Sequence, residues 1–215
     1  METSAFSVLE LFMLGGVMMW PLLLFSIAVV AISIERAVFL FYHNLNIDDL
    51  EQKTREFVKN KDYNGAQEYL GGLTKRRMGA RIFLALVSSV KAEKGDAGFE
   101  RRAERAVETE AANCINSLEN GFNFLTALGS LSPLTGFLGT VTGMIGAFRS
   151  IAEATEVNAQ IVANGIYEAL ITTVFGLIIA IIAMVFHSIF SHIVDKFTSR
   201  VEGAVTKLIS QIADL

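Results

Sequence analysis

The stretch that decides the fold is VNAQIVANGIYEALITTVFGLIIAIIAMVFHSIFSHIV, which runs from Val157 to Val194. Glu168 is its one acidic residue, and the stretch contains no lysine or arginine. About 20 helical residues are enough to cross the ~30 Å hydrocarbon core of a bilayer. The stretch is longer than that and almost free of charge, so it predicts a membrane-spanning helix.

Two further stretches have the same character. One runs from Phe12 to Ile34, and the other lies between Glu119 and Arg149. A fourth apolar run, Ile82 to Val90, has less than half the length that a bilayer requires, and we expect it to pack in a soluble helix. The sequence therefore predicts an all-α membrane protein with three transmembrane helices.

Composition supports this class and argues against several functions. Hydrophobic residues make up 52% of the chain and charged residues 19%, which is too apolar for an ordinary soluble domain. The net charge of -4 gives no basic excess that would suggest nucleic acid as a partner. One cysteine and 3 scattered histidines offer no internal disulfide, metal site or Cys/His nucleophile. We expect no cofactor and no enzymatic activity.

The distribution of basic residues predicts the orientation in the membrane. Most lysines and arginines lie between the first and second apolar stretches, and Lys196, Arg200 and Lys207 follow the third. Basic residues mark the cytoplasmic side of a membrane protein, so the amino terminus is expected outside. The first stretch is preceded by Glu2 and Glu10 and by no basic residue, which is unlike an export signal.

These observations divide the chain into six expected segments. They are an amino terminus outside the cell membrane with the first transmembrane helix (1–42), a cytoplasmic helical segment (43–119), the second transmembrane helix (120–151), a short outer connection (152–159), the third transmembrane helix (160–190) and a cytoplasmic helical tail (191–215).

Helix signals refine the cytoplasmic segment. Asn46 is a candidate cap for a helix that Gly71 and Gly72 would end, and Gly95-Asp96 marks the next break. Apolar residues then recur at helical spacing without glycine or proline until Gly121, which predicts one unbroken helix from Phe99 into the second span. The third span is expected to continue as an amphipathic tail. The apolar positions of that tail are Phe197, Val201, Val205, Leu208 and Ile212.

Small residues form a stripe along each of the last two spans. Such stripes let membrane helices approach closely, so we expect the two helices to pair, within one subunit or between subunits. The stripe of the second span comprises Gly129, Ser132, Gly136, Gly139, Gly143 and Gly146. The matching face of the third comprises Gly165, Ala169, Thr172, Gly176, Ala180 and Ala183.

A second face of the second span is polar. Thr126, Pro133 and Thr140 recur every seven residues, and Thr135 and Thr142 add hydroxyls. Because proline has no N–H, the carbonyl four residues before it is free to accept a hydrogen bond from a hydroxyl or from water. The pattern favours a hydrated face.

Glu168 is the sharpest single signal in the sequence. A carboxylate inside a spanning helix costs ~2.5 kcal/mol or more, and such residues usually face a bundle interior or water and mark ion routes. The alternative is a structural salt bridge, for which Arg149 is the candidate partner. His187 and His192 lie too far along the helix to join Glu168 in one cluster.

Two motifs of these spans resemble a known family. They are SPLTGFLGTVTGMI (Ser132–Ile145) and GIYEALITTVFGL (Gly165–Leu177). In this order they are similar to the second and third membrane helices of the MotA/TolQ/ExbB proton-channel family, and specifically to its ExbB/TolQ branch. Two positions depart from the family pattern: Thr142 stands where a tryptophan is common, and Ile182 where a proline is common.

The resemblance implies a homopentameric ring in the bacterial inner membrane, with the second and third helices extending as long cytoplasmic helices. It implies an ExbD/TolR-like one-span partner with a membrane aspartate, and a TonB- or TolA-like periplasm-spanning protein. The ion-pathway positions of the family fall on Thr140, Glu168 and Thr173. The helix-packing and pore-face positions fall on Pro133, Gly136, Gly139, Gly143 and Gly176.

The expected function is therefore conversion of protonmotive force into mechanical work. Protons are the expected coupling ion, and sodium stays open because Thr142 adds a hydroxyl where the family carries tryptophan. A structural membrane scaffold that conducts no ions is an alternative. A solute transporter is disfavoured because the sequence shows no inverted repeats or broken paired helices.

Overall fold

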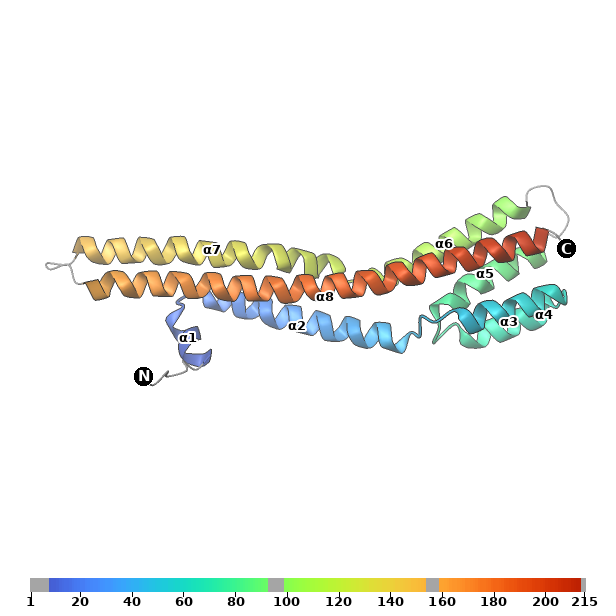
Figure 1. Cartoon of the computed structure of the whole chain (residues 1–215), viewed down its shortest axis with the longest axis horizontal. Coiled ribbons are helices and arrows are strands. Elements are labelled where there is room, and N and C mark those ends of the chain that lie inside the picture. Colours follow the sequence, from blue (N-terminus) through green and yellow to red (C-terminus); the bar gives the residue numbers. More distant parts are fainter. Residues whose placement is uncertain (1–7, 93–98, 154–158, 214–215) are drawn as a thin grey trace. The chain divides into compact units, whose positions relative to one another are not determined.

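The computed structural model describes residues 8–92, 99–153 and 159–213, and its regular structure in these ranges is helical throughout. The expected break at Gly95-Asp96 and most of the connection 152–159 lie outside the described residues. Figure 1 labels the helices in chain order. They are α1 (Val8–Leu14), α2 (Met19–Tyr42), α3 (Asp48–Lys59), α4 (Tyr63–Leu73), α5 (Met78–Ala92), α6 (Phe99–Glu119), α7 (Phe122–Glu153) and α8 (Ala159–Ala213).

Three helical stretches of the described chain are long and apolar enough to cross a bilayer. They cover residues 19–42, 101–153 and 163–212. Many of their large apolar side chains point outward; Phe137 and Leu170, for example, are 64% and 57% exposed. Exposed apolar surface of this extent is typical of a membrane or partner interface. The expectation of an all-helical protein with three stretches long and apolar enough to span a membrane is confirmed for the described residues.

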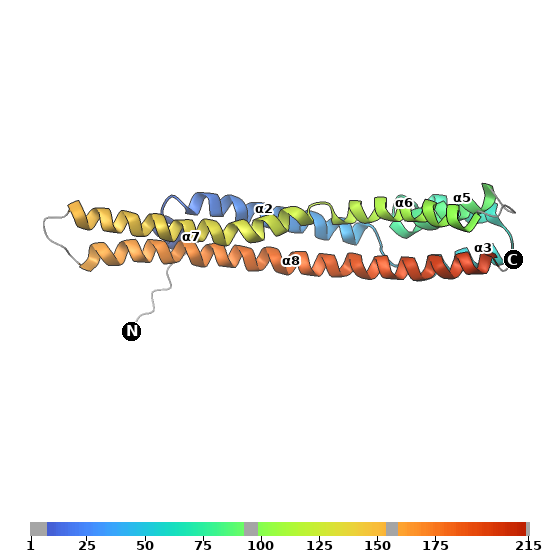
Figure 2. The same cartoon turned by 90° about the horizontal axis from the view of Figure 1, so that it is seen from above.

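The chain divides into two compact units. The first comprises residues 1–34 and 121–188, and the second comprises residues 35–120 and 189–215. The first unit contains α1, most of α2, α7 and the amino-terminal part of α8. In both views α7 and this part of α8 run side by side (Figures 1 and 2).

Glycines make the contact between α7 and α8 close. A Cβ atom on Gly136 would lie 2.8 Å from the carbonyl oxygen of Thr172, and one on Gly176 would lie 2.5 Å from that of Ser132. On Gly139 it would lie 2.7 Å from Cβ of Thr172. The two small-residue stripes therefore meet within one subunit. Gly146 alone among the stripe glycines of α7 has open space at its Cβ position.

The second unit is built around α5. Its residues Ile82, Phe83, Leu86 and Val90 are at most 1% exposed, and α5 packs against both α4 and α6. At 15 residues α5 is too short to span a membrane. The prediction that this apolar run packs in a soluble helix is consistent with its place in the core.

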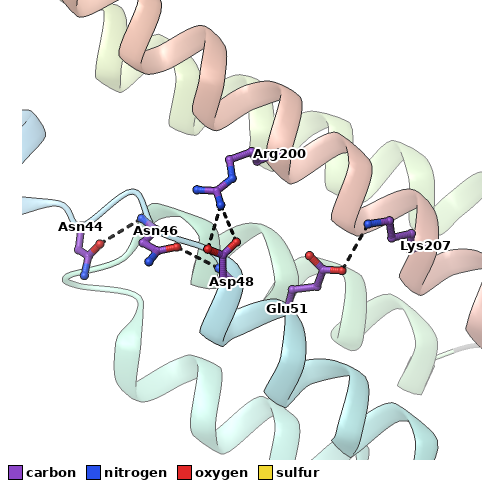
Figure 3. A network of polar contacts seen from close by, with 6 residues as sticks. All are labelled: Asn44, Asn46, Asp48, Glu51, Arg200 and Lys207. Atoms are coloured by element: carbon purple, nitrogen blue, oxygen red, sulfur yellow. Dashed lines mark hydrogen bonds and ion pairs between the residues drawn. The ribbon is translucent and has the colours of Figure 1, made fainter.

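The carboxyl-terminal part of α8 belongs to the same core. Helix α8 is continuous over 55 residues, which confirms the expected extension of the third span. The five apolar residues predicted for its tail are all at most 7% exposed. Asp48 of α3 accepts two hydrogen bonds from Arg200, and Glu51 lies 3.9 Å from Nζ of Lys207 (Figure 3). Apart from the half-buried Glu51 these side chains are exposed, so burial of the apolar stripe contributes most of the stability of this contact.

Two predicted helix boundaries are wrong. The second span does not run unbroken from Phe99, because α6 ends at Glu119 and α7 begins at Phe122. Gly121 between them has φ 88°, a left-handed conformation that ends a helix and that glycine adopts without steric cost. The expected long cytoplasmic extension of the second span is therefore a separate helix, α6.

The other error concerns Gly71 and Gly72, which lie inside α4 and do not end a helix that starts near Asn46. The break comes earlier, at Lys61 with φ 56°, and Asp62 accepts a hydrogen bond from the Gly65 N–H to begin α4. Asn46 does accept a hydrogen bond from the Asp48 N–H, although Ile47 is the residue that flanks α3 (Figure 3).

The close contact predicts a large effect of substitution at one stripe glycine, Gly176 of α8, and almost none at another, Gly146 of α7. Gly176→Ala places a methyl group against the α7 backbone and should lower the free energy of unfolding by about 1–3 kcal/mol. Gly146→Ala meets open space and should change it by less than about 0.5 kcal/mol. Thermal unfolding in detergent, followed by circular dichroism, measures both. Equal melting temperatures for the two variants would contradict the packing.

Candidate functional site

Glu168 lies on α8 in the first unit, where its side chain is half-buried. It lines a hollow of about 220 Å³ together with Gly139 and Thr142 of α7 and residues of the α1–α2 turn. It also lines a hollow of about 600 Å³ that includes Thr142, Gly143 and Tyr167. The carboxylate therefore lies where two hollows meet, beside α7.

Thr142 is the residue that the structure adds to the site. It lines both hollows with Glu168, and its hydroxyl donates to the carbonyls of Leu138 at 3.0 Å and Gly139 at 3.1 Å. A hydroxyl that donates to the backbone still has lone pairs that can accept a hydrogen bond from water. In the sequence Thr142 stood out as a hydroxyl of the predicted hydrated face and as a departure from the family pattern, and not as an ion-pathway residue. Thr142 follows Gly139 by three residues, so the two lie on the same side of α7. Gly139 contacts Thr172, which lies one turn from Glu168 on α8.

Thr172 and Thr173 connect the two helices. Both hydroxyls donate to the carbonyl of Gly136 on α7, at 3.3 and 3.2 Å, and Thr172 also donates to Ala169 at 2.7 Å. Thr172 is 1% exposed, whereas Thr173 is half-buried. These hydroxyls supply the interhelical hydrogen bonds that membrane helices use for association.

Thr140 lies on another part of α7. It is half-buried, and its hydroxyl donates to the carbonyl of Phe137 at 2.6 Å. Neither of the two hollows beside Glu168 is lined by Thr140 or Thr173. Within one subunit the structure thus brings Glu168 together with Thr142, and places the other two predicted ion-pathway residues outside these hollows.

The predicted helix-packing residues of α7 are a proline inside the helix and glycines that contact α8. Helix α7 continues through Pro133, and Gly136, Gly139 and Gly143 are buried against α8. The hydroxyl of Ser132 donates to Leu128 at 2.6 Å. The hydroxyls of Ser130 and Ser132 therefore bond to carbonyls other than that of Gly129, which the proline leaves without its helical donor.

Charged and metal-binding groups near the site are sparse. Arg149 forms an ion pair of 2.9 Å with Glu153, and in the described residues Glu168 has no ion pair. His187 packs edge-on against Phe122, with ring centroids 5.8 Å apart. No group of three metal-ligating side chains occurs in the part of the chain that the structure describes. Within the described residues the Glu168 carboxylate is therefore not held by a salt bridge to Arg149.

Comparison with known proteins gives consistent matches. Residues 74–203 match the model of the MotA/TolQ/ExbB proton channel family. A putative biopolymer transport protein ExbB-like 3 of Synechocystis sp. is 32% identical over 186 residues, covering 83% of this chain and 82% of the relative. The biopolymer transport protein ExbB of Salmonella typhimurium is 26% identical over 198 residues, covering 90% and 80%. The Tol-Pal system protein TolQ of Haemophilus influenzae is 36% identical over 127 residues, covering 58% and 56%.

The matched region contains both glycine stripes, Glu168, and helices α5 and α6 of the second unit. Three helical stretches able to cross a bilayer, close pairing of α7 and α8, and a carboxylate within an apolar helix agree with the match. Relatives of both kinds, ExbB and TolQ, are biopolymer-transport and Tol-Pal system proteins, and none is named as an enzyme. The chain therefore belongs to the MotA/TolQ/ExbB proton channel family, as a multi-pass membrane protein of its ExbB/TolQ branch.

Proposed function

We propose that this chain is the ring-forming subunit of an inner-membrane motor that converts protonmotive force into mechanical work. Five copies form the ring, and an ExbD/TolR-like protein places its membrane aspartate inside it. The motion is passed to a TonB- or TolA-like protein that spans the periplasm. The observation that carries this proposal is the Glu168 carboxylate, which has no ion pair in the described residues and lines two hollows with Thr142.

The proposed ring follows from a shortage of helices. Three spanning helices per chain enclose little space, and α7 and α8 already use their glycine faces on each other. A path for ions therefore needs several copies around a common centre, with α7 and α8 innermost. Each elementary charge that crosses 100 mV releases ~2.3 kcal/mol, so a few protons suffice for a large conformational step.

Glu168 is the proposed proton-binding group of this chain, and the threonines are proposed to orient water. A hydroxyl can relay a hydrogen bond but does not hold a charge, which a carboxylate does. Thr140 and Thr173 use their hydroxyl hydrogens on backbone carbonyls and keep lone pairs for water. The partner aspartate supplies the second titratable group that proton transfer requires.

The proposed topology places the amino terminus in the periplasm and the second unit in the cytoplasm. It rests on the lysines and arginines of residues 43–119 and of the α8 tail. A sodium-driven relative of the same motor is a second candidate, because Thr142 beside Glu168 adds an oxygen that suits a hard cation. The alternative of a membrane scaffold that conducts no ions requires the Glu168 carboxylate to hold the helices together through a salt bridge.

The proposed ring predicts the mass of the assembled protein. Native mass spectrometry of the purified protein in mild detergent should give a homopentamer at several protein concentrations. Gly139→Leu should disturb assembly, because Gly139 lies against Thr172 and a bulky side chain separates α7 from α8. A stable monomer or dimer for the unaltered chain would contradict the ring.

The ion path predicts losses of transport without loss of assembly. Glu168→Ala should reduce proton flux to background while the pentamer persists. Thr140→Val and Thr173→Val keep shape but remove a hydroxyl, so flux should fall several-fold with partner binding unchanged. Proteoliposomes of the complex, with an internal pH dye and an imposed potential, measure this. Full flux in all three variants would remove the assignment.

Arg149 distinguishes the ion path from the structural anchor. Because Arg149 pairs with Glu153 and is exposed, Arg149→Ala should leave assembly and proton flux within twofold of the unaltered protein. The same proteoliposomes and native mass spectra provide the comparison with Glu168→Ala. If both variants lose assembly together, Glu168 is anchored by Arg149 in the ring.

A further inference from the structure

We propose that the turn at Gly15 and Gly16, between α1 and α2, covers the Glu168 carboxylate and confines access to it to the side of Thr142. Gly16 is then a positioning residue for the carboxylate. The consequence for ion transfer rests on the proposed function of Glu168, whereas the cover itself rests on contacts within the first unit alone.

The contact at Gly16 leaves no room for a side chain. Its φ is 66°, in the left-handed region that favours glycine. A Cβ atom at this position would collide with Oε1 of Glu168 and would lie 2.8 Å from its Cδ and 3.5 Å from its Cγ. Two independent features, backbone conformation and space, therefore require glycine over the carboxylate.

The turn is held in place from both ends. The Gly15 N–H donates to the carbonyls of Leu11 at 3.1 Å and Phe12 at 3.3 Å, and the Met19 N–H donates to Gly16 at 3.3 Å. Met19 is 1% exposed, and a Cβ atom on Gly15 would lie 3.2 Å from a methyl carbon of Ile171 on α8. These contacts fix the turn against the same face of α8 that carries Glu168.

The hollows show where access remains. Residues of α1 and the turn line both: Met13 and Leu14 the larger, and Gly15 with Met18 the smaller. Thr142 lines both from the opposite helix. The α1–α2 segment therefore forms one wall around the carboxylate and α7 the other. Both hollows through which water or an ion would reach Glu168 are therefore lined by Thr142.

Reaction with dicyclohexylcarbodiimide tests the cover directly, because this apolar reagent modifies protonated carboxyl groups in membranes. The purified ring with its one-span partner is labelled in liposomes, and the adduct at Glu168 is followed by mass spectrometry of peptides. Gly16→Ala should move the carboxylate from beneath the turn, raise the labelling rate at least threefold and reduce proton flux. An unchanged or lower labelling rate would overturn the proposal.

Three further variants separate the contact from general damage. Gly121→Ala introduces an L side chain at another left-handed glycine, φ 88°, and should label as the unaltered protein does. Gly16→Asn keeps the collision but suits a positive φ, so it replaces Gly16→Ala if the latter fails to assemble. In a Glu168→Asp background the carboxylate is withdrawn by one methylene, so Gly16→Ala should raise the labelling rate by less than the threefold expected with Glu168 in place.

The outcomes distinguish this proposal from the ion-path assignment. Faster labelling in Gly16→Ala together with full flux in Glu168→Ala would support the proposal that the turn covers the carboxylate, and would contradict the transport role of Glu168. Unchanged labelling in Gly16→Ala together with lost flux in Glu168→Ala would keep the transport role and overturn the cover. A threefold labelling change that persists in the Glu168→Asp background would also overturn it, because the effect would not depend on the contact.

Discussion

Close packing of α7 on α8 is the interaction on which the membrane unit depends. Inside a bilayer the lipid tails are as apolar as leucine, so helices associate through van der Waals contact and hydrogen bonds. Gly136, Gly139 and Gly176 remove the side chains that would separate the backbones, and Thr172 and Thr173 then reach the Gly136 carbonyl. Without this approach the hydroxyls would lack their acceptor, and the Glu168 face would not meet Thr142.

The same packing explains why one carboxylate is tolerated in an apolar helix. Glu168 lines two hollows in which glycines and Thr142 of α7 face apolar side chains of α1 and the turn, and it does not belong to the outward apolar surface that Leu170 and Val174 form. A carboxylate that lines a water-filled hollow costs less than one in hydrocarbon. The Gly15–Gly16 turn adds a third element to a site that the α7 and α8 motifs describe only in part.

Stability in the second unit comes from a different source. There α5 is surrounded by other helices, and the apolar stripe of the α8 tail is buried in the same core. The ion pairs of Asp48 and Glu51 with the α8 tail lie near the surface and add little free energy. They are compatible with the alignment of α3 and the α8 tail that the apolar contacts determine. One helix thus carries an ion-binding candidate at one end and a packed core at the other.

Length and charge spacing alone determined the class of the protein, the three stretches able to span a membrane and the continuous α8, and they singled out Glu168 as a candidate, because a bilayer imposes a length and penalises charge. The paired glycine stripes were also legible, since they recur at helical spacing. Tertiary structure decided which stripe residues touch, and it left Gly146 open. It also decided the breaks at Lys61 and Gly121, where positive φ values depend on how the flanking helices pack. The contact of Gly16 with Glu168 joins residues far apart in the chain, and no local pattern encodes such a contact.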